Sequence, residues 1–381
     1  PATTTGYSPV FDRPRAREHL FQMSLMELTP AHRGLLSDFR AGKRTALARV
    51  ISLVENERPG FQAILHDLHG DLGRAQRIGI TGPPGAGKST MTAALAAAYR
   101  RRGETVAVVA VDPTSPFTGG ALLGDRIRMN EVATDEGVFI RSMASRGSLG
   151  GLAVTTNEVV DVLDAFGFDR ILIETVGVGQ SELDIAATAD TTVVVLVPES
   201  GDSIQAMKAG LMEISDLFVV NKADRPGADR LTREIELMLH LRTGKGMHRV
   251  PAHHGVDLRR AGARNGTEAE AKDRVAGEGS GSESWEIPVL QTVAETGTGI
   301  AELQAVLDKH AAWLSESGEL LRRRRARAVA RVREVVERRI AEIVWVERGG
   351  EALLDEGLPA LEEGRETPYT LAARIVRGVA G

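Results

Sequence analysis

Nine consecutive residues of this chain have the types and the spacing of a phosphate-binding loop. They are Gly82, Pro83, Pro84, Gly85, Ala86, Gly87, Lys88, Ser89 and Thr90, and they match G-x-x-x-x-G-K-[ST] at every fixed position. Glycines let backbone N–H groups turn inward around a phosphate, and the start of a helix adds positive potential. We therefore expect Lys88 to contact the β- and γ-phosphates of a nucleotide, and the Ser89 hydroxyl to ligate Mg²⁺.

A second motif indicates which base the nucleotide carries. Asn221-Lys222-Ala223-Asp224 ends an apolar run and matches the N-K-x-D pattern of GTPases. The Asp224 carboxylate can accept hydrogen bonds from both N–H groups on the edge of guanine, whereas adenine presents a different donor pattern. Lys222 can lie along the base and the ribose. Together with the phosphate loop, this motif favours GTP over ATP.

Acidic residues are needed to complete a magnesium site, because Mg²⁺ prefers oxygen ligands and keeps several waters. Asp112 and Glu174 each end an apolar run, and Asp125 lies in a Gly-Asp-Arg turn. For Asp125 alone, a simple turn-forming role is a fair alternative. The residues do not separate Asp112 from Glu174 in the two jobs of orienting the attacking water and holding the metal. The backbone N–H of Gly177 could bind a γ-phosphate.

The elements that must position these residues alternate between strand-like and helical patterns. Continuous apolar runs, typical of parallel strands covered on both faces, occur at 77–81, 106–111, 138–141, 170–174, 192–197, 217–221 and 289–293. Helical stretches separate most of them, and the phosphate loop is followed by one at 91–102. The pattern predicts an α/β fold over 73–310, with a mostly parallel, doubly wound sheet and ligands at the carboxyl ends of its strands.

The residues before this domain, and one stretch within it, lack the alternation of strand and helix patterns. Residues 1–17 are polar and contain proline, and we expect a flexible arm. Residues 18–72 predict a helical extension, with Thr29-Pro30 as a helix start and an apolar stripe over 47–54 that packs on the next domain. Residues 243–284, rich in Gly, Ala and charge, predict a mobile surface insertion whose His253-His254 pair is a solvated loop rather than a metal site.

The last part of the chain, 311–381, predicts a helical arm. One apolar stripe has helical spacing: Val329, Val332, Val336, Ile340 and Ile343. The basic run 322–325 is soon balanced by glutamates, which favours a solvated helix face over a nucleic-acid patch. A long amphipathic helix beyond a complete domain needs a partner, and a second copy of the chain is the simplest one. We expect a homodimer.

Composition excludes several other classes of protein. The net charge of -5 over 381 residues argues against a nucleic-acid partner. The chain has no cysteine, which excludes disulfides, thiolate metal sites and thiol nucleophiles and fits a cytoplasmic location. No run of 18 apolar residues is present, so we expect no membrane span. The N-terminus lacks the apolar core of a secretory signal.

With these motifs assembled, the chain resembles the MeaB/ArgK-type GTPases, a family that includes the human MMAA protein and guards adenosylcobalamin-dependent acyl-CoA mutases. The stretches that carry the resemblance are 81–90, 111–115, 124–129, 174–182 and 221–224. The resemblance implies an N-terminal helical extension, a P-loop GTPase domain and a C-terminal helical dimerisation arm. It also implies slow hydrolysis of GTP to GDP, accelerated by the mutase.

The family pattern assigns two further stretches. The segment 201–210, with Gln205 and Lys208, is implied to move and to relay the state of the mutase to the nucleotide. The base-contacting stretch corresponds to Val293, Ala294 and Glu295, where a Ser-Ala pair of the family is replaced by Val293-Ala294. The insertion at 243–284 is longer than the family pattern.

The leading prediction is a GTPase that gates cofactor loading and the protection or reactivation of a mutase. A nickel-type metallochaperone GTPase should carry a Cys or His cluster, and the chain has no cysteine. An ATP-driven partitioning or transport protein usually lacks Asn-Lys-x-Asp. A passive GTP-binding scaffold would release no phosphate, which an assay distinguishes. The residues do not identify which acyl-CoA mutase is the partner.

Overall fold

The computed structural model describes residues 27–113, 132, 134–145, 154–175, 185–198, 210–242 and 284–380. It divides into two compact units, Pro1–Ser317 and Gly318–Gly381, which are described separately below. The expected flexible arm at 1–17 and almost all of the expected insertion at 243–284 lie outside the described residues.

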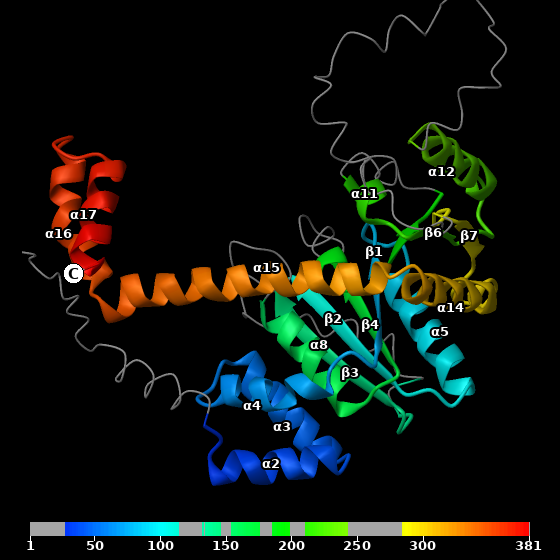
Figure 1. The fold of residues 1–381 in the computed structure, drawn as a ribbon. Coiled ribbons are helices and arrows are strands. Elements are labelled where there is room, and N and C mark those ends of the chain that lie inside the picture. The colour runs from blue at the N-terminus through cyan, green and yellow to red at the C-terminus, as the bar shows by residue number, and fades with distance from the viewer. Residues whose placement is uncertain are drawn as a thin grey trace, which may run out of the picture. The chain divides into compact units, whose positions relative to one another are not determined.

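A seven-stranded sheet forms the centre of the first unit (Figure 1), in the order β3-β2-β4-β1-β5-β6-β7. Every neighbouring pair is parallel. The strands are β1 (Gln76–Thr81), β2 (Val106–Pro113), β3 (Val138–Ser145), β4 (Arg170–Thr175), β5 (Thr191–Leu196), β6 (Leu217–Asn221) and β7 (Val289–Thr292). The predicted α/β fold with a parallel, doubly wound sheet is confirmed, and each predicted strand matches one of these within a few residues at its ends.

Helices cover both faces of the sheet because its strands are apolar on both sides. On one face, α5 (Lys88–Arg101) and α14 (Ile300–Glu316) share a core with Val106 and Val108 of β2. The alternate residues Ala107 and Val109 point to the other face. That face is covered by α8 (Val154–Phe166), α12 (Ala228–Arg242) and the N-terminal helices. The short elements are η1 (His69–Asp71), η2 (Ile185–Ala187) and α11 (Met212–Ile214).

The N-terminal helices form a packing layer on the sheet domain, as predicted. They are α2 (Pro30–Arg40), α3 (Arg44–Glu55) and α4 (Phe61–Leu68). The Thr29 hydroxyl caps α2 by accepting a hydrogen bond from the His32 N–H at 3.2 Å, and Pro30 is the first helical residue. The predicted stripe of α3 is fully buried and shares a core with α8.

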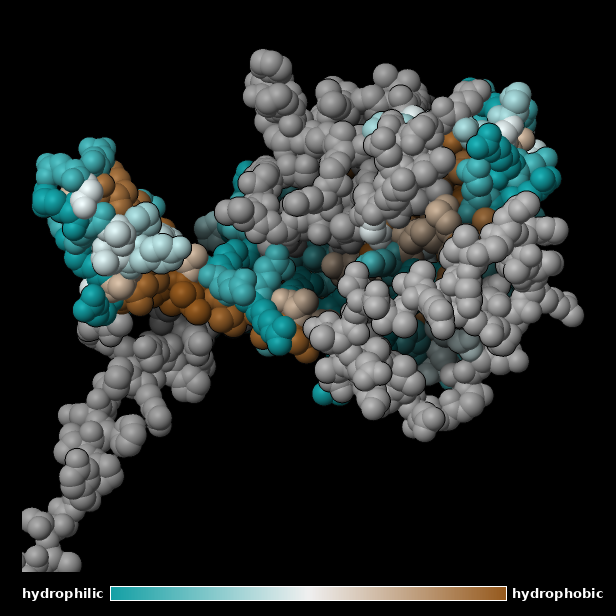
Figure 2. Space-filling model, turned by 90° about the horizontal axis from the view of Figure 1, so that it is seen from above, coloured by the Kyte–Doolittle hydropathy of each residue, from teal (hydrophilic) through white to brown (hydrophobic). Residues whose placement is uncertain are grey.

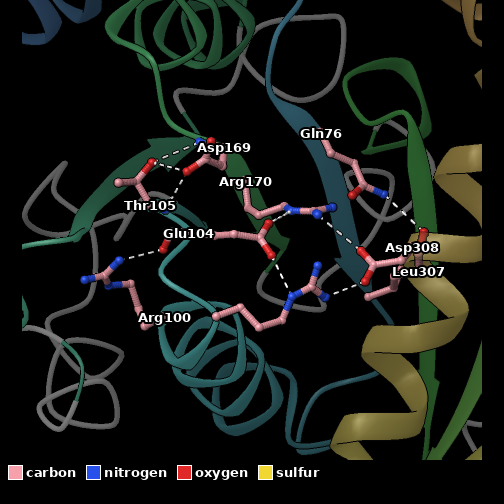
Figure 3. Close-up of polar contacts among 9 residues, drawn as sticks. Gln76, Arg100, Glu104, Thr105, Asp169, Arg170, Leu307 and Asp308 are labelled. Atoms are coloured by element: carbon pink, nitrogen blue, oxygen red, sulfur yellow. Dashed lines mark hydrogen bonds and ion pairs between the residues drawn. The ribbon is translucent and has the colours of Figure 1, made fainter.

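At the edge of the sheet opposite the phosphate loop, a ring of charges ties α5 and α14 to the strands (Figure 3). Arg102, just after α5, pairs with Glu104 and with Asp308 of α14, and Arg170 of β4 pairs with the same two carboxylates. The Arg170 guanidinium also lies 4.7 Å from the centroid of the Tyr99 ring, and burial raises the pKa of the Tyr99 phenol. The ring fixes the end of α5 and the middle of α14 against the strands.

The second unit is helical. It contains α15 (Glu319–Glu342), the π-helical turn η5 (Ile343–Glu347), α16 (Gly350–Glu362) and α17 (Pro368–Ala380). Helices α16 and α17 pack closely at Gly357, where a Cβ atom would lie 2.3 Å from Leu371 Cδ1. By this division the second unit begins at Gly318, whereas the predicted arm begins at residue 311, which lies in α14.

No residue of helix α15 is buried, and apolar residues gather along part of the arm (Figure 2). Val332 is 64% exposed and Ile340 is 55% exposed. Large apolar side chains in water on one helix face mark an interaction surface. Of the helices described, none has the length and apolar character that crossing a membrane requires.

Candidate nucleotide-binding site

The phosphate loop connects the end of β1 to the start of α5. Gly82, Gly85 and Gly87 all have positive φ angles, of 137°, 74° and 87°. A Cβ atom on Gly82 would lie 2.1 Å from the Val195 carbonyl oxygen, and one on Gly87 would lie 2.4 Å from Asn221 Nδ2. These two positions therefore require glycine for conformation and for space. Helix α5 begins at Lys88, earlier than the predicted start at residue 91, because Gly87 acts as its cap.

The two polar motif residues occupy the first turn of α5. Lys88 Nζ donates hydrogen bonds to the carbonyl oxygens of Gly82 at 2.7 Å and Pro83 at 3.0 Å, which holds the ammonium group over the loop. The Ser89 hydroxyl donates to a carboxylate oxygen of Glu174, near the end of β4. Glu174 is 1% exposed. The phosphate loop and the predicted acidic residue of β4 are thus in direct contact.

The oxygen atoms of Ser89 and Glu174 are suitable ligands for Mg²⁺. A hydroxyl and a carboxylate are oxygen ligands of the kind that Mg²⁺ prefers. Within the described ranges, no cluster of three or more His, Cys, Asp or Glu residues is placed to hold a metal. Mg²⁺ is commonly bound through one or two protein groups together with waters and substrate phosphates, so a sparse site of this type suits a metal shared with a nucleotide.

Asn221 connects the phosphate loop to the loop after β7. Its Nδ2 donates to the Ala86 carbonyl oxygen at 2.9 Å. Its Oδ1 accepts from the Ala294 N–H and from the Thr292 hydroxyl, both at 3.1 Å. The side chain is buried, with the whole residue 2% exposed. One amide therefore joins three segments that are far apart in the sequence.

The remaining base-recognition residues surround Asn221. Lys222 adopts a left-handed conformation, with a φ of 57°, and its Nζ donates to the Gly85 carbonyl oxygen at 2.9 Å. Asp224 is exposed in the turn after β6, where its carboxylate is accessible to a ligand. Val293 pairs with Thr298 in an isolated antiparallel bridge, and Glu295 is exposed in the turn between them. The sequence-predicted base site therefore lies at one edge of the sheet.

Several predicted site residues lie outside what the structure describes. They are Asp125, Gly177, Gln205 and Lys208, together with the side chain of Asp112, whose backbone lies in β2. Conversely, the motif patterns did not single out Thr175 or Thr292, although both contribute hydroxyl groups to this edge. Each is the last residue of its strand, and Thr292 stands opposite Asn221 in the β6–β7 register. The register of β6 and β7 is the signal that identifies Thr292.

Comparisons with known proteins agree with this geometry. Residues 47–348 match the family described as methylmalonyl Co-A mutase-associated GTPase MeaB. A protein of Pyrococcus horikoshii that is named as a GTPase is 46% identical over 81% of this chain and 87% of its own length. The methylmalonic aciduria type A homolog of Mus musculus, named as mitochondrial, is 34% identical over 74% of this chain and 64% of its own.

A solved structure supports the same assignment. The crystal structure of an LAO/AO transport system kinase superposes with a TM-score of 0.62 at 25% identity, covering 93% of this chain and all of the other. The family match spans well over half of the chain, and its residues include the phosphate loop, Glu174 and Asn221. The chain belongs to the MeaB family of methylmalonyl-CoA mutase-associated GTPases and is a GTP hydrolase that binds guanine nucleotides.

Proposed function

We propose that this GTPase is a chaperone of an adenosylcobalamin-dependent acyl-CoA mutase in the cytoplasm. GTP binding and hydrolysis gate the loading of the cofactor and the protection or reactivation of the mutase. The family description, which names the association with methylmalonyl-CoA mutase, supports the partner. The name of the mouse relative, which refers to methylmalonic aciduria, points to the same metabolic context.

The single observation that carries the nucleotide chemistry is the contact between Ser89 and Glu174 beside the phosphate loop. Hydrolysis of GTP needs positioning of water and neutralisation of charge more than covalent chemistry. Mg²⁺ bound with the nucleotide would supply part of that neutralisation, and the Ser89 hydroxyl would ligate it. Lys88 and the loop N–H groups supply the rest.

The carboxylates orient this machinery. Glu174 accepts the Ser89 hydroxyl hydrogen, which leaves the lone pairs of the Ser89 oxygen free to ligate Mg²⁺. Asp112 at the end of β2, with Asp125 as a further candidate, shares the tasks of holding the metal through water and orienting the attacking water. The Gly177 N–H binds the γ-phosphate.

Guanine specificity rests on the neighbouring edge. Asp224 accepts the two N–H groups of the base, Lys222 lies along it, and the stretch Val293–Glu295 covers the remaining side. Asn221 is placed to hold this stretch against the phosphate loop, because it hydrogen-bonds both Ala86 and Ala294. Base and phosphate sites are thereby kept at a fixed distance.

Coupling to the mutase needs an element that contacts the nucleotide differently in its two states. We assign this role to the segment 201–210, through Gln205 and Lys208. It follows β5, whose neighbour β1 leads into the phosphate loop. Dimerisation is assigned to the second unit, whose helix α15 exposes Val332 and Ile340.

Co-purification with candidate mutases tests the proposal. Tagged protein is mixed with purified methylmalonyl-CoA, isobutyryl-CoA and 2-hydroxyisobutyryl-CoA mutases in the presence of GTP or GDP. One of them should bind, accelerate phosphate release, and receive adenosylcobalamin in a nucleotide-dependent way. A Lys88→Ala control should bind the mutase without supporting that acceleration. If no mutase changes the hydrolysis rate and none is loaded differently with GTP and GDP, the chaperone role is wrong while the GTPase assignment stands.

A further inference from the structure

The ends of β1 and β4 are joined by a hydrogen bond between side chains. The backbone ladder of these parallel strands runs from Gln76 opposite Arg170 to Ile80 opposite Glu174. The next residues, Thr81 and Thr175, continue it through their hydroxyl groups, with Thr175 Oγ1 donating to Thr81 Oγ1 at 3.1 Å. Both residues are 0% exposed. A buried hydroxyl pair thus closes the ladder directly beside Glu174.

Glu174 and Thr175 point to opposite faces of the sheet, because successive side chains in a strand alternate. Glu174 reaches Ser89 on α5, on the same face as the buried Leu172. Thr175 lies on the other face with Ile173, which packs in the core beneath the N-terminal helices and α8. The hydroxyl contact of Thr175 on one face thus directly adjoins, in the strand, the carboxylate contact of Glu174 on the other.

Strands β1 and β4 end at Thr81 and Thr175. Immediately after Thr81 the chain turns into the phosphate loop at Gly82, whose φ is 137°. The β1–β4 backbone ladder ends at the pair that contains Glu174, so on the β1 side the Thr175–Thr81 bond is the interaction that continues it, while on the other side Thr175 is in register with Val111 of β2. Rotation of the β4 end would move the Glu174 carboxylate relative to Ser89.

We infer that Thr175 is a positioning residue for Glu174, and that its hydroxyl sets the geometry of the Ser89–Glu174 pair toward a divalent cation. This inference rests on the metal site of the proposed function. It adds a residue that acts from the opposite face of the sheet through its bond to Thr81.

The direct test measures cation binding without turnover. The dissociation constant of Mn²⁺ in the GDP complex is obtained from the EPR signal of free Mn²⁺. Thr175→Val keeps the shape and deletes the donor, and it should raise this constant about two- to tenfold, the size of one neutral hydrogen bond. Thr175→Ser keeps the hydroxyl and should stay within about twofold of wild type by the same estimate.

A matched control deletes another buried threonine hydroxyl at the opposite end of the sheet. Thr191, the first residue of β5, is 0% exposed. Its Oγ1 lies 2.8 Å from Nδ1 of His310 in α14. Thr191→Val should lower the melting temperature as Thr175→Val does, but leave Mn²⁺ affinity unchanged. If the two variants weaken Mn²⁺ binding equally, the effect is one of general stability and the inference is wrong.

A double-mutant cycle identifies the route of the effect. In a Glu174→Gln background, Thr175→Val should cause no further loss of Mn²⁺ affinity, because the positioned carboxylate is gone. An equal loss in both backgrounds overturns the inference. Should Thr175→Val fail to fold, Thr81→Val removes the acceptor of the same bond and must give the same pattern. If Glu174→Gln itself leaves Mn²⁺ affinity unchanged, the proposed metal site falls, and the role of Thr175 falls with it.

Discussion

Asn221→Ala should weaken guanine-nucleotide binding strongly, because this one side chain makes three buried hydrogen bonds. The change leaves the Ala86 carbonyl and the Ala294 N–H without their partner, while the Thr292 hydroxyl can rotate to another acceptor. A buried group left unpaired costs about 1–3 kcal/mol. Two such groups at the edge of a site that water can enter give about 2–3 kcal/mol, the lower part of the summed range.

In the free variant the two segments relax so that these groups pair with water, and nucleotide binding must bring the segments back together. The same free energy is then lost from GDP binding, about 30- to 140-fold in affinity, since about 1.4 kcal/mol is a factor of ten. Isothermal titration with GDP measures the affinity, and urea unfolding of the same variant separates loss of binding from loss of fold stability. Thr292→Val is the matched control. It removes a single hydroxyl contact to the same asparagine, and GDP affinity should stay within a few-fold of wild type.

The reasoning fails if Asn221→Ala binds GDP within about threefold of wild type, which is less than one ordinary hydrogen bond is worth. It also fails if Thr292→Val is as damaging as Asn221→Ala. In that case the link to the Ala86 carbonyl and the Ala294 N–H would not be what holds the base site together.

Four other changes test the remaining assignments. Asp224→Asn should lower GTP affinity about 10- to 100-fold, the value of hydrogen bonds to a charged group, and should allow xanthine nucleotides to bind. Competition assays that give equal ATP and GTP affinities for the wild type would refute guanine selection. Lys88→Ala should reduce steady-state phosphate release by about 10²–10³-fold, and a rate within a few-fold of wild type would exclude its role. A chain ending at Ser317 should be monomeric in light scattering, because the exposed stripe of α15 is removed; a truncated dimer would locate the interface elsewhere. Gln205→Ala and Lys208→Ala should keep basal hydrolysis but lose most of the acceleration by the mutase, and a wild-type response of both would exclude segment 201–210 as the relay.

The sequence predicts those parts of the site that are formed by consecutive residues. The phosphate loop and Asn221–Asp224 are short stretches whose backbone geometry and side-chain chemistry are local, and each follows an apolar strand. Because parallel strands present their carboxyl ends at one edge, the meeting of these motifs with Glu174 also follows from the fold class. The structure places Ser89 against Glu174 and Ala86 against Asn221, as that argument requires.

What the sequence does not predict depends on which strands become neighbours. Thr292 contacts Asn221 only because β7 pairs with β6, although α12 and the stretch 243–283 lie between these two strands in the sequence. Thr175 meets Thr81 only because β4 lies beside β1, although β2 and β3 come between them in the sequence. The sequence pattern also predicts too late a start for α5, because the phosphate-loop motif extends to Thr90 while Gly87 already caps the helix.

The three tryptophans of the chain are divided between its two units. Trp285 and Trp313 belong to the first, with ring centroids 5.7 Å apart and His310 packed against both. Trp345 belongs to the second, in η5. Trp345→Phe therefore confines the tryptophan fluorescence of the protein to the GTPase unit, and replacing Trp285 and Trp313 confines it to the arm. The emission spectrum can then report the unfolding of each unit separately within one intact chain.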